Sequence, residues 1–203
     1  MDKLMIIGAG GHGRVIADLA EKLNTYKEIA FLDDCAQSSA EVPVLGKVSE
    51  YSRFADEYEF VVGIGNNAVR RKLVETLFEK VQLVSLVHER AVLAKNVKIG
   101  KGVVVFANAV LNVGAELGDG VIVNTAAVVE HDCKIGAFAH VCPRAVLAGS
   151  VEVGENTFIG VGSSVANNVR ICSDVILGAG SVVVKNITEA GTYVGVPIRK
   201  VIK

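Results

Sequence analysis

A histidine and an aspartate stand side by side in the segment Glu130-His131-Asp132-Cys133. Imidazole is a suitable general base near neutral pH, because its ordinary pKa is about 6.5. A carboxylate that accepts a hydrogen bond from one ring nitrogen fixes the tautomer and makes the other nitrogen a stronger base. We therefore predict that His131 is a general base supported by Asp132. The alternative is that Asp132 is only a solvated corner residue.

A glycine-rich loop near the amino end is typical of phosphate binding. Gly8, Gly10 and Gly13 form the pattern GxGxxG, and Asp33 follows about 20 residues later. Glycines let the backbone approach a ligand, and the amino end of a following helix offers free N–H groups to an anion. About 85 residues hold one mononucleotide half of a Rossmann fold, so a nucleotide sugar fits better than a nicotinamide cofactor. A glycine turn without a ligand is the alternative.

The remaining histidines and the cysteines give weaker signals. We expect His88 to be structural, while His140 is either a surface residue or a ligand contact. The four cysteines are widely spaced without a CxxC pair, which predicts reduced thiols in the cytoplasm and no zinc site. We expect no metal, and a nucleophilic Cys133 or Cys142 is a minor alternative.

A repeat with a period of six dominates the second part of the chain. Every sixth position from Val87 to Val183 is Ile, Leu or Val, without exception. Glycine follows this position at Gly100, Gly118, Gly136 and Gly154, which adds a longer period of three repeats. A helix cannot use a period of six, whereas three short strands joined by corners can close a triangular coil. We predict stacked coils with a narrow aliphatic core, paired by parallel ladders.

The segment 1–85 predicts a small parallel α/β domain. We expect strands at 4–7, 28–32, 60–64 and 81–87, with helices at 14–23 and 68–80. Its ligand site belongs at the carboxyl ends of the strands. The predicted domains are thus 1–85, Rossmann-like, and 86–203, the coil with a short tail.

Composition excludes several classes of function. The chain has 203 residues, a formal net charge of -1 and 51% hydrophobic residues, which fits a folded protein and argues against a general nucleic-acid binder. No apolar run is long enough for a membrane span, and the amino end lacks a secretory signal pattern.

The combination of the two domains resembles one family. It is similar to the hexapeptide-repeat nucleotide-sugar acetyltransferases, which include the bacillosamine-pathway UDP-4-amino-sugar N-acetyltransferases and the sialic acid O-acetyltransferase-like proteins. The motifs that carry the resemblance are Gly8-Ala9-Gly10-Gly11-His12-Gly13, Phe31-Leu32-Asp33-Asp34, Gly63-Ile64-Gly65-Asn66-Asn67, Asn124-Thr125, Glu130-His131-Asp132-Cys133, Phe138-Ala139-His140-Val141 and Gly195-Val196-Pro197. The resemblance implies a left-handed parallel β-helix, whereas the usual crossover rule alone favours a right-handed one.

The resemblance also implies substrates and site residues. The expected reaction is acetyl transfer from acetyl-CoA to the amine of a UDP-linked 4-amino-4,6-dideoxy sugar for glycan biosynthesis, in a cytoplasmic homotrimer whose sites lie between solenoids. Its catalytic residues would be His131, Asp132, Gly149 and Asn124, with aspartate at 132 where close relatives have glutamate. Gly149 lies one coil beyond His131, and its N–H is the expected oxyanion donor. Acetyl-CoA contacts would come from His140, Gly160, Val161, Gly178 and Ala179, and nucleotide-sugar contacts from Gly10, Gly11, His12, Asp33, Asp34 and Gly65.

Other functions stay open on the sequence. An O-acetyltransferase acting on sialic acid or another glycan sugar would use the same base on a hydroxyl. A non-catalytic nucleotide-sugar sensor, an NAD-dependent enzyme and a purely structural solenoid are alternatives of other classes.

Overall fold

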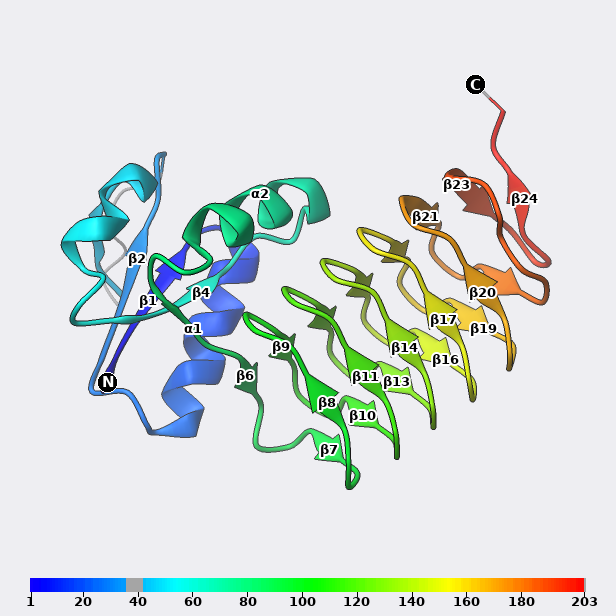
Figure 1. The fold of residues 1–203 in the computed structure, drawn as a ribbon, viewed down its shortest axis with the longest axis horizontal. Coiled ribbons are helices and arrows are strands. Elements are labelled where there is room, and N and C mark those ends of the chain that lie inside the picture. Colours follow the sequence, from blue (N-terminus) through cyan, green and yellow to red (C-terminus); the bar gives the residue numbers. More distant parts are fainter. Residues whose placement is uncertain (36–41, 203) are drawn as a thin grey trace.

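The computed structural model of the chain describes residues 1–35 and 42–202. It consists of an α/β domain and a three-sided solenoid that lie side by side, with the carboxyl end at the far end of the solenoid (Figure 1). No helix among the described residues is long and apolar enough to cross a lipid bilayer.

The α/β domain is built on one parallel sheet with the strand order β3-β2-β1-β4-β5. Its elements are β1 (Lys3–Ile7), α1 (Gly11–Leu23), β2 (Glu28–Leu32), β3 (Val44–Gly46), the 3₁₀ helix η1 (Val48–Arg53), β4 (Glu59–Val62), α2 (Asn67–Leu77) and β5 (Gln82–Leu83). The Leu4 to Ile7 side chains of β1 are fully buried, because helices cover both faces of the sheet. The Asn66 side chain caps α2 by accepting a hydrogen bond from the Val69 N–H at 3.0 Å.

The solenoid is made of three sheets. We call the sheet that contacts the α/β domain the docking face, and we name the valine face and the charged face after their outward-pointing residues. The docking face contains β6 (Leu86–Val87), β9 (Val104–Val105), β12 (Ile122–Val123), β15 (His140–Val141), β18 (Phe158–Ile159), β21 (Val175–Leu177), β23 (Gly191–Val194) and β24 (Arg199–Lys200), of which β24 alone is antiparallel. The valine face contains β7 (Val92–Leu93), β10 (Val110–Leu111), β13 (Val128–Val129), β16 (Val146–Leu147), β19 (Ser164–Val165) and β22 (Val182–Val183). The charged face contains β8 (Lys98–Ile99), β11 (Glu116–Leu117), β14 (Lys134–Ile135), β17 (Glu152–Val153) and β20 (Arg170–Ile171).

Each strand pairs with the strand one full coil, or three repeats, further along the chain, as in the pair Val128↔Val146. The residues of the six-residue repeat point inward and form one continuous aliphatic core, in which Leu111, Val129 and Leu147 are fully buried. The corners turn through the left-handed region, often at Asn, Asp or Gly; at Asp132, for example, φ is 59°. The period therefore predicts both the coil length and the inward positions.

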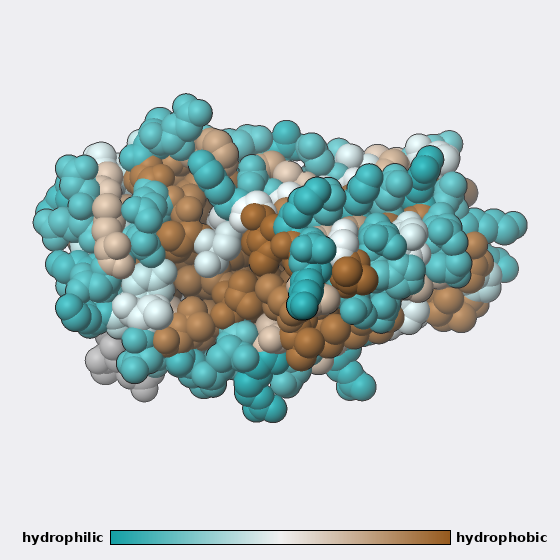
Figure 2. Space-filling view, turned by 60° about the horizontal axis from the view of Figure 1, so that its bottom comes forward, coloured by the Kyte–Doolittle hydropathy of each residue, from teal (hydrophilic) through white to brown (hydrophobic). Residues whose placement is uncertain are grey.

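The outward residues of the three faces differ in chemistry. On the charged face, Lys98, Glu116, Lys134, Glu152 and Arg170 stack in register with alternating charge, and ion pairs join Lys98 to Glu116 at 2.7 Å and Arg170 to Glu152 at 3.3 Å. On the valine face the outward row is Val92, Val110, Val128, Val146, Ser164 and Val182. Figure 2 shows an apolar band along the lower side of the molecule. Within the valine row, Val92 is 60% exposed.

The docking face positions the α/β domain. Leu86, Val104 and Ile122 are its first outward residues, and they share one buried cluster with Ile16 and Leu19 of α1. Farther along the same row, Phe158 is half-buried and Ile176 is 49% exposed. The α/β domain thus covers the amino-terminal half of this face and leaves the rest open.

Several predicted elements differ from the structure: β4 ends at Val62 rather than at residue 64, and α2 ends at Leu77 rather than at residue 80. The predicted strand 81–87 is two strands, because β5 belongs to the α/β sheet and β6 already belongs to the solenoid. Strand β3 and helix η1 are additional to the predicted elements, since both are short and have no apolar period. Helix α1 begins at Gly11, inside the glycine loop, rather than at Arg14.

Candidate active site

His131 and Asp132 lie at the corner between β13 of the valine face and β14 of the charged face. The His131 Nδ1 atom lies 2.9 Å from Asp132 Oδ2. A carboxylate at this distance accepts the Nδ1 proton, so the lone pair of the neutral ring resides on Nε2. Both side chains are exposed in the single chain, at 55% and 67%. The pair therefore has the tautomer that a general base requires, on an open edge of the solenoid.

Gly149 provides the surface on which the imidazole lies. A methyl group added at Gly149 would sit 2.4 Å from His131 Nε2 and 2.5 Å from Cε1, so only glycine allows this position of the ring. The Gly149 carbonyl accepts a hydrogen bond from Asn168, but within the described chain no hydrogen bond uses the Gly149 N–H. A free N–H beside the basic nitrogen is the arrangement that stabilises an oxyanion formed next to the base.

A second cluster of predicted residues lies where the α/β domain meets the docking face. The Asn124 Nδ2 atom lies 3.0 Å from His140 Nε2, and the His140 ring packs against Phe158 with centroids 5.2 Å apart. The His12 ring lies 6.2 Å from that of His140, and Gly65 packs against His12. His140 is 6% exposed, because the α/β domain of its own chain covers it.

The electrostatics of this junction favour neutral histidines. Burial, together with the positive charge of Arg70, lowers the pKa of His12 to about 4. The same two causes, with a smaller contribution from His12, lower the pKa of His140 to about 3, and the Gly65 backbone opposes them only weakly. Since Asn124 Nδ2 is a donor, neutral His140 accepts with Nε2 and carries its proton on Nδ1.

The glycine loop is shaped by close packing on one side and is open on the other. A methyl group at Gly13 would lie 1.9 Å from the Gly8 carbonyl oxygen, so this glycine lets α1 approach β1. Gly10 and Gly11 have no neighbouring atom within 4 Å of such a methyl group. They are exposed at the start of α1, where free N–H groups can meet an anion.

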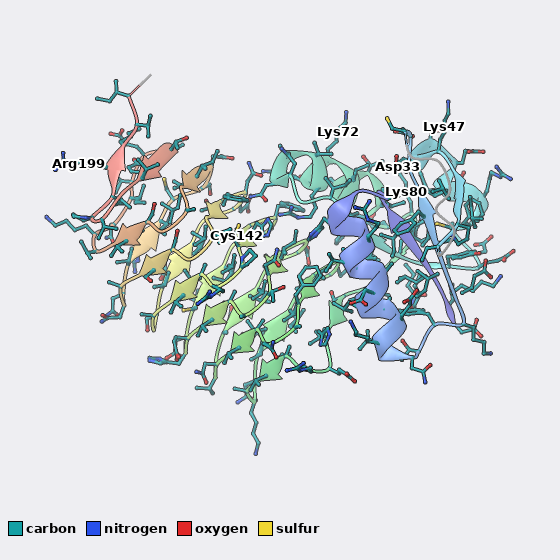
Figure 3. All side chains as sticks on the ribbon, turned by 180° about the vertical axis from the view of Figure 1, so that it is seen from behind. Asp33, Lys47, Lys72, Lys80, Cys142 and Arg199 are labelled. Carbon is teal, nitrogen blue, oxygen red and sulfur yellow. The ribbon has the colours of Figure 1, made fainter. Side chains whose placement is uncertain are left out.

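The carboxyl ends of β1 and β2 enclose a cavity of about 520 Å³. It is lined by Gly8, Asp33, Asp34, Ala68 and Lys72, among others. The carboxylate of Asp33 accepts from the Ala9 N–H at 2.7 Å and from the Cys35 N–H at 2.8 Å, so it holds the glycine loop against β2. Figure 3 shows Asp33 and Lys72 at this end of the α/β domain, far from Cys142 in the solenoid.

A smaller cavity of about 380 Å³ opens beside the junction. Its walls are Gly65 to Ala68 at the start of α2 and Asn156, Phe158, Asp174 and Ile176 of the solenoid. Ala68 lines both cavities, so the two spaces flank the beginning of α2. The largest hollow, about 1040 Å³, follows the charged face and contains none of the predicted site residues.

The residues predicted for acetyl-CoA lie along one edge of the solenoid. Gly160 and Val161 follow β18, and Gly178 and Ala179 follow β21, at the corner between the docking and valine faces. Val161 is 49% exposed, and Ala179 is exposed. A methyl group at Gly160 would lie 2.3 Å from the Leu177 carbonyl oxygen, so coil stacking by itself accounts for this glycine.

The cysteines and the other histidine take no part in these clusters. Cys133 and Cys142 are buried, Cys35 is exposed, and all four cysteines are unpaired. Burial raises the pKa of Cys142 to about 12, which disfavours a thiolate nucleophile. His88 is buried and accepts from the Arg90 N–H at 3.0 Å. No group of three His, Cys, Asp or Glu among the described residues could hold a metal ion.

Comparison with known proteins places this geometry in a family. Residues 3–77 match the model of the PglD N-terminal domain, and residues 150–185 match the bacterial transferase hexapeptide model (six repeats). The acetyltransferase domain of PglB from Neisseria gonorrhoeae is 40% identical, with a TM-score of 0.96 over 99% of this chain and 100% of that one. The chain belongs to the hexapeptide-repeat nucleotide-sugar acetyltransferases. It is an α/β domain followed by a left-handed parallel β-helix.

Other relatives in this acetyltransferase family were solved with bound ligands or are named for a reaction. PerB from Caulobacter crescentus, solved with CoA and GDP-perosamine, is 36% identical, with a TM-score of 0.92 over 97% of this chain and 96% of that one. UDP-N-acetylbacillosamine N-acetyltransferase of Bacillus subtilis is 36% identical over 113 residues. That match spans about half of each chain, 53% of this one and 52% of the relative.

Sequence reasoning missed residues that the structure brings to the acetyltransferase junction. Arg70 is 1% exposed and lies beside His12 and His140, and Asn67 donates to the Asn156 carbonyl at 3.0 Å. Lys72 lines the cavity that contains Asp33. The available signal is the run Arg70-Arg71-Lys72, which begins three residues after the Gly65-Asn66-Asn67 motif and by itself indicates no more than the polar side of a helix.

Proposed function

We propose that this chain transfers the acetyl group of acetyl-CoA to the amine of a UDP-linked 4-amino-4,6-dideoxy sugar of the bacillosamine type. The product would serve glycan biosynthesis. The observation that carries the proposal is the His131 ring, oriented by Asp132 and packed on Gly149, whose N–H forms no hydrogen bond within the described chain. The Bacillus subtilis relative, named as a UDP-N-acetylbacillosamine N-acetyltransferase, supports the choice of substrate.

The proposed mechanism is direct attack without an acyl-enzyme. The sugar amine attacks the thioester carbonyl, and His131 Nε2 takes a proton from the nitrogen as the C–N bond forms. The Gly149 N–H donates to the oxyanion, and Asp132 stabilises the imidazolium. The C–S bond then breaks, and the imidazolium returns its proton to the CoA thiolate. The products are the N-acetylated sugar nucleotide and free CoA, so atoms and charges balance.

In this proposal the α/β domain binds the nucleotide sugar. Gly10, Gly11 and the amino end of α1 would meet the diphosphate, and Asp33 with Asp34 would border the nucleoside in the cavity of about 520 Å³. His12 and Gly65 lie between this cavity and the docking face, on the way to the solenoid. Asn124 would orient the acceptor through its contact with His140.

In this proposal a second copy of the chain completes the site. The His131 corner joins the valine and charged faces, and it is therefore opposite the docking face that carries the α/β domain. The valine face is bounded by the His131 edge on one side and by the Asn124, Val161 and Ala179 edge on the other. Packing of valine faces around a threefold axis would bring these two edges of neighbouring chains together. We therefore propose a homotrimer with acetyl-CoA along that cleft.

The same arrangement accounts for the remaining predicted contacts. Gly160, Val161, Gly178, Ala179 and His140 of one chain would border the acetyl-CoA whose thioester lies against His131 of the next. The exposed valine row supports the interface, because such a stripe loses water contact when copies associate. We place the reaction in the cytoplasm, where four unpaired thiols fit a reducing environment.

The direct test is acetyl transfer with a panel of acceptors. We expect the purified chain to release CoA with a UDP-linked 4-amino sugar, and a His131→Ala variant to lose at least about 100-fold in rate. Because PerB binds GDP-perosamine, a GDP-linked amino sugar is included. Turnover with sialic acid alone would instead indicate O-acetylation, and a wild type that binds the nucleotide sugar but releases no CoA would indicate a sensor.

The trimer has its own test, by complementation of two impaired variants at a nucleotide-sugar concentration well below the KM, where Asp33→Ala is also slow. His131→Ala lacks the base, and Asp33→Ala weakens the nucleotide site on a different domain. If each site uses two chains, mixed trimers contain some sites with both functional parts, and activity returns after the variants are unfolded and refolded together. Recovery would be absent if each chain acted alone. Light scattering should give three copies, and Val128→Glu on the valine face should give one.

A further inference from the structure

Arg70 of α2 is a buried cation in the described structure, at 1% exposure, and it spans the two domains. Its guanidinium donates to the carbonyl oxygens of Ile64 at 3.1 Å and Gly65 at 3.0 Å, and to Asn67 Oδ1 at 2.9 Å, all in the α/β domain. It also donates to the carbonyl oxygens of Gly120 at 2.8 Å and Phe138 at 2.6 Å in the solenoid. One planar group thus joins one loop of the α/β domain to two coils.

All of these acceptors are neutral. Arg70 forms no ion pair with any described carboxylate, and burial lowers its pKa only to about 10, so it stays charged at neutral pH. A buried charge without a counter-ion costs stability, which five good hydrogen bonds offset only in part. Hydrophobic packing would close the junction without this cost. The retained guanidinium therefore points to a requirement beyond domain docking.

The groups held by Arg70 are the ones that face the proposed substrate path. Gly65 and Asn67 line the cavity of about 380 Å³ beside Phe158. Gly65 also packs against His12, and the Phe138 carbonyl is two residues from His140. The titratable groups that feel the charge of Arg70 are His12, His140 and Cys142. Arg70 therefore fixes both walls of the junction, and its charge adds to the burial that lowers the pKa values of its two histidines.

We propose that Arg70 is a positioning residue, which holds the Gly65 loop and His12 of the nucleotide-sugar domain in register with the solenoid strand that carries His140. This inference rests on the function proposed above. It makes Arg70 act on the bound nucleotide sugar through the loop, with no contact to the reacting atoms. A lysine at this place keeps the charge, but its single ammonium cannot reach acceptors on both domains in the same fork geometry.

The test is the steady-state kinetics of Arg70→Lys with both substrates. We expect the KM for the nucleotide sugar to rise at least about tenfold, because the substitution removes several charge-assisted hydrogen bonds that hold the loop. The KM for acetyl-CoA and the kcat at saturation should stay near the wild-type values. A merely structural role would reduce the folded fraction, which lowers kcat for every substrate and leaves both KM values unchanged.

Arg71→Lys is the matched control. Arg71 lies next to Arg70 on α2 and also approaches the solenoid, with an ion pair to Glu155 at 3.8 Å, but it is 42% exposed. Exposed pairs contribute little, so its KM values should not change. Equal effects of the two substitutions, or none from Arg70→Lys, would overturn the inference.

A second variant covers the case in which Arg70→Lys does not fold. Asn67→Ala removes one acceptor of Arg70 and the bond to the Asn156 carbonyl, so it should shift the same KM in the same direction by less. Calorimetry with UDP and GDP gives a readout without turnover. If the wild type binds neither nucleotide, the proposed function and this inference both fail. If the wild type is active and both variants match it, only the inference fails.

NMR titration of the two buried histidines provides an independent test of the role of Arg70. In Arg70→Gln the positive charge is gone, so the NMR titrations of His12 and His140 should move to higher pH than in the wild type. Unchanged titrations in a folded Arg70→Gln variant would show that Arg70 does not control the electrostatics of this junction.

Discussion

In the solenoid, the stacking of one coil on the next fixes the position of each candidate functional residue. In the α/β domain, the loops that follow the strands fix these positions. His131 and Gly149 are neighbours because one coil stacks on the next. Gly8, Asp33 and Ile64 line one cavity because three separate strands end at one edge of a sheet. A repeat fixes a small constellation rigidly, whereas loop ends can change length and sequence at little cost to the fold. Under the proposed function, the acetyl-transfer chemistry would belong to the solenoid, and the choice of nucleotide sugar would belong to the loops.

The largest effect should come from filling the space beneath the base. Gly149→Ala places a methyl group 2.4 Å from the present position of His131 Nε2, so the ring must leave the Gly149 N–H. We expect kcat to fall about 1,000-fold, since the base and the oxyanion donor are affected together. Stopped CoA-release assays measure this loss, and equilibrium binding of acetyl-CoA shows whether the groove survives.

Val113→Ala is the control for this prediction. Val113 lies one coil before His131, at the same corner between the valine face and the charged face, and its side chain is 49% exposed. Its truncation should leave kcat unchanged. A Gly149→Ala enzyme with wild-type kcat would mean that the solenoid does not hold the reacting groups, and the division between the two regions would break down.

Alanine substitution of one glycine in each domain tests the same comparison by its effect on stability. A methyl group at Gly154 would lie 2.3 Å from the Ser173 backbone nitrogen of the next coil, while one at Gly10 in the α/β loop meets no atom within 4 Å. We expect Gly154→Ala to lower the free energy of unfolding by about 2–3 kcal/mol, because the coils must separate. Gly10→Ala should change it by less than about 0.5 kcal/mol. Urea unfolding measures both, and equal losses would contradict the assignment of Gly10 to an open, ligand-facing position.

The sequence predicts the solenoid better than the α/β domain for the same physical reason. A period of six that holds from Val87 to Val183 predicts a three-sided coil, although its left hand came from the family resemblance. The predicted pairing of His131 with Asp132 agrees with the distance of 2.9 Å between their side chains. Strand β3 and helix η1 have no comparable period, so only the finished sheet specifies them. The strand expected at 81–87 is wrong because two sheets share one apolar run.

The junction is the least predictable part of the candidate site. Arg70, His12 and His140 are far apart in the sequence and meet only because α1 docks on Leu86, Val104 and Ile122. That docking row has a signal in the sequence, since these residues are apolar where the charged face has Lys98 and Glu116. The repeat predicts that His140 faces away from His131, but it does not reveal that its own α/β domain buries it.

We expect a smaller effect on the kinetics from a substitution in a loop of the α/β domain. Asp33→Ala removes the acceptor for the Ala9 and Cys35 N–H groups, so the glycine loop loses its tie to β2. We expect the KM for the nucleotide sugar to rise about tenfold with kcat nearly unchanged. Asp18→Ala on the exposed side of α1, which pairs only with Lys22, should leave both constants unchanged. A loss in kcat alone from Asp33→Ala would place chemistry on the α/β domain.

The smallest effect concerns the pH dependence of stability at the junction. Unfolding frees His12 and His140, whose pKa values then return from about 4 and about 3 to their ordinary value. Below about pH 6.5 the unfolded chain therefore takes up protons that the folded chain does not, and stability falls as the pH is lowered. Each histidine contributes a slope of at most about 1.4 kcal/mol per pH unit. Urea unfolding between about pH 7 and pH 5, above the range of most carboxylates, measures this slope.

His140→Gln isolates the contribution of one residue to this slope. Glutamine keeps an acceptor for the Asn124 amide but does not titrate. As the pH falls this variant should lose less stability than the wild type, so the difference in the free energy of unfolding between the two should shift in favour of the variant. Parallel curves would mean that His140 takes up protons equally in the folded and unfolded chain, and a buried, neutral junction between the two regions would then be untenable.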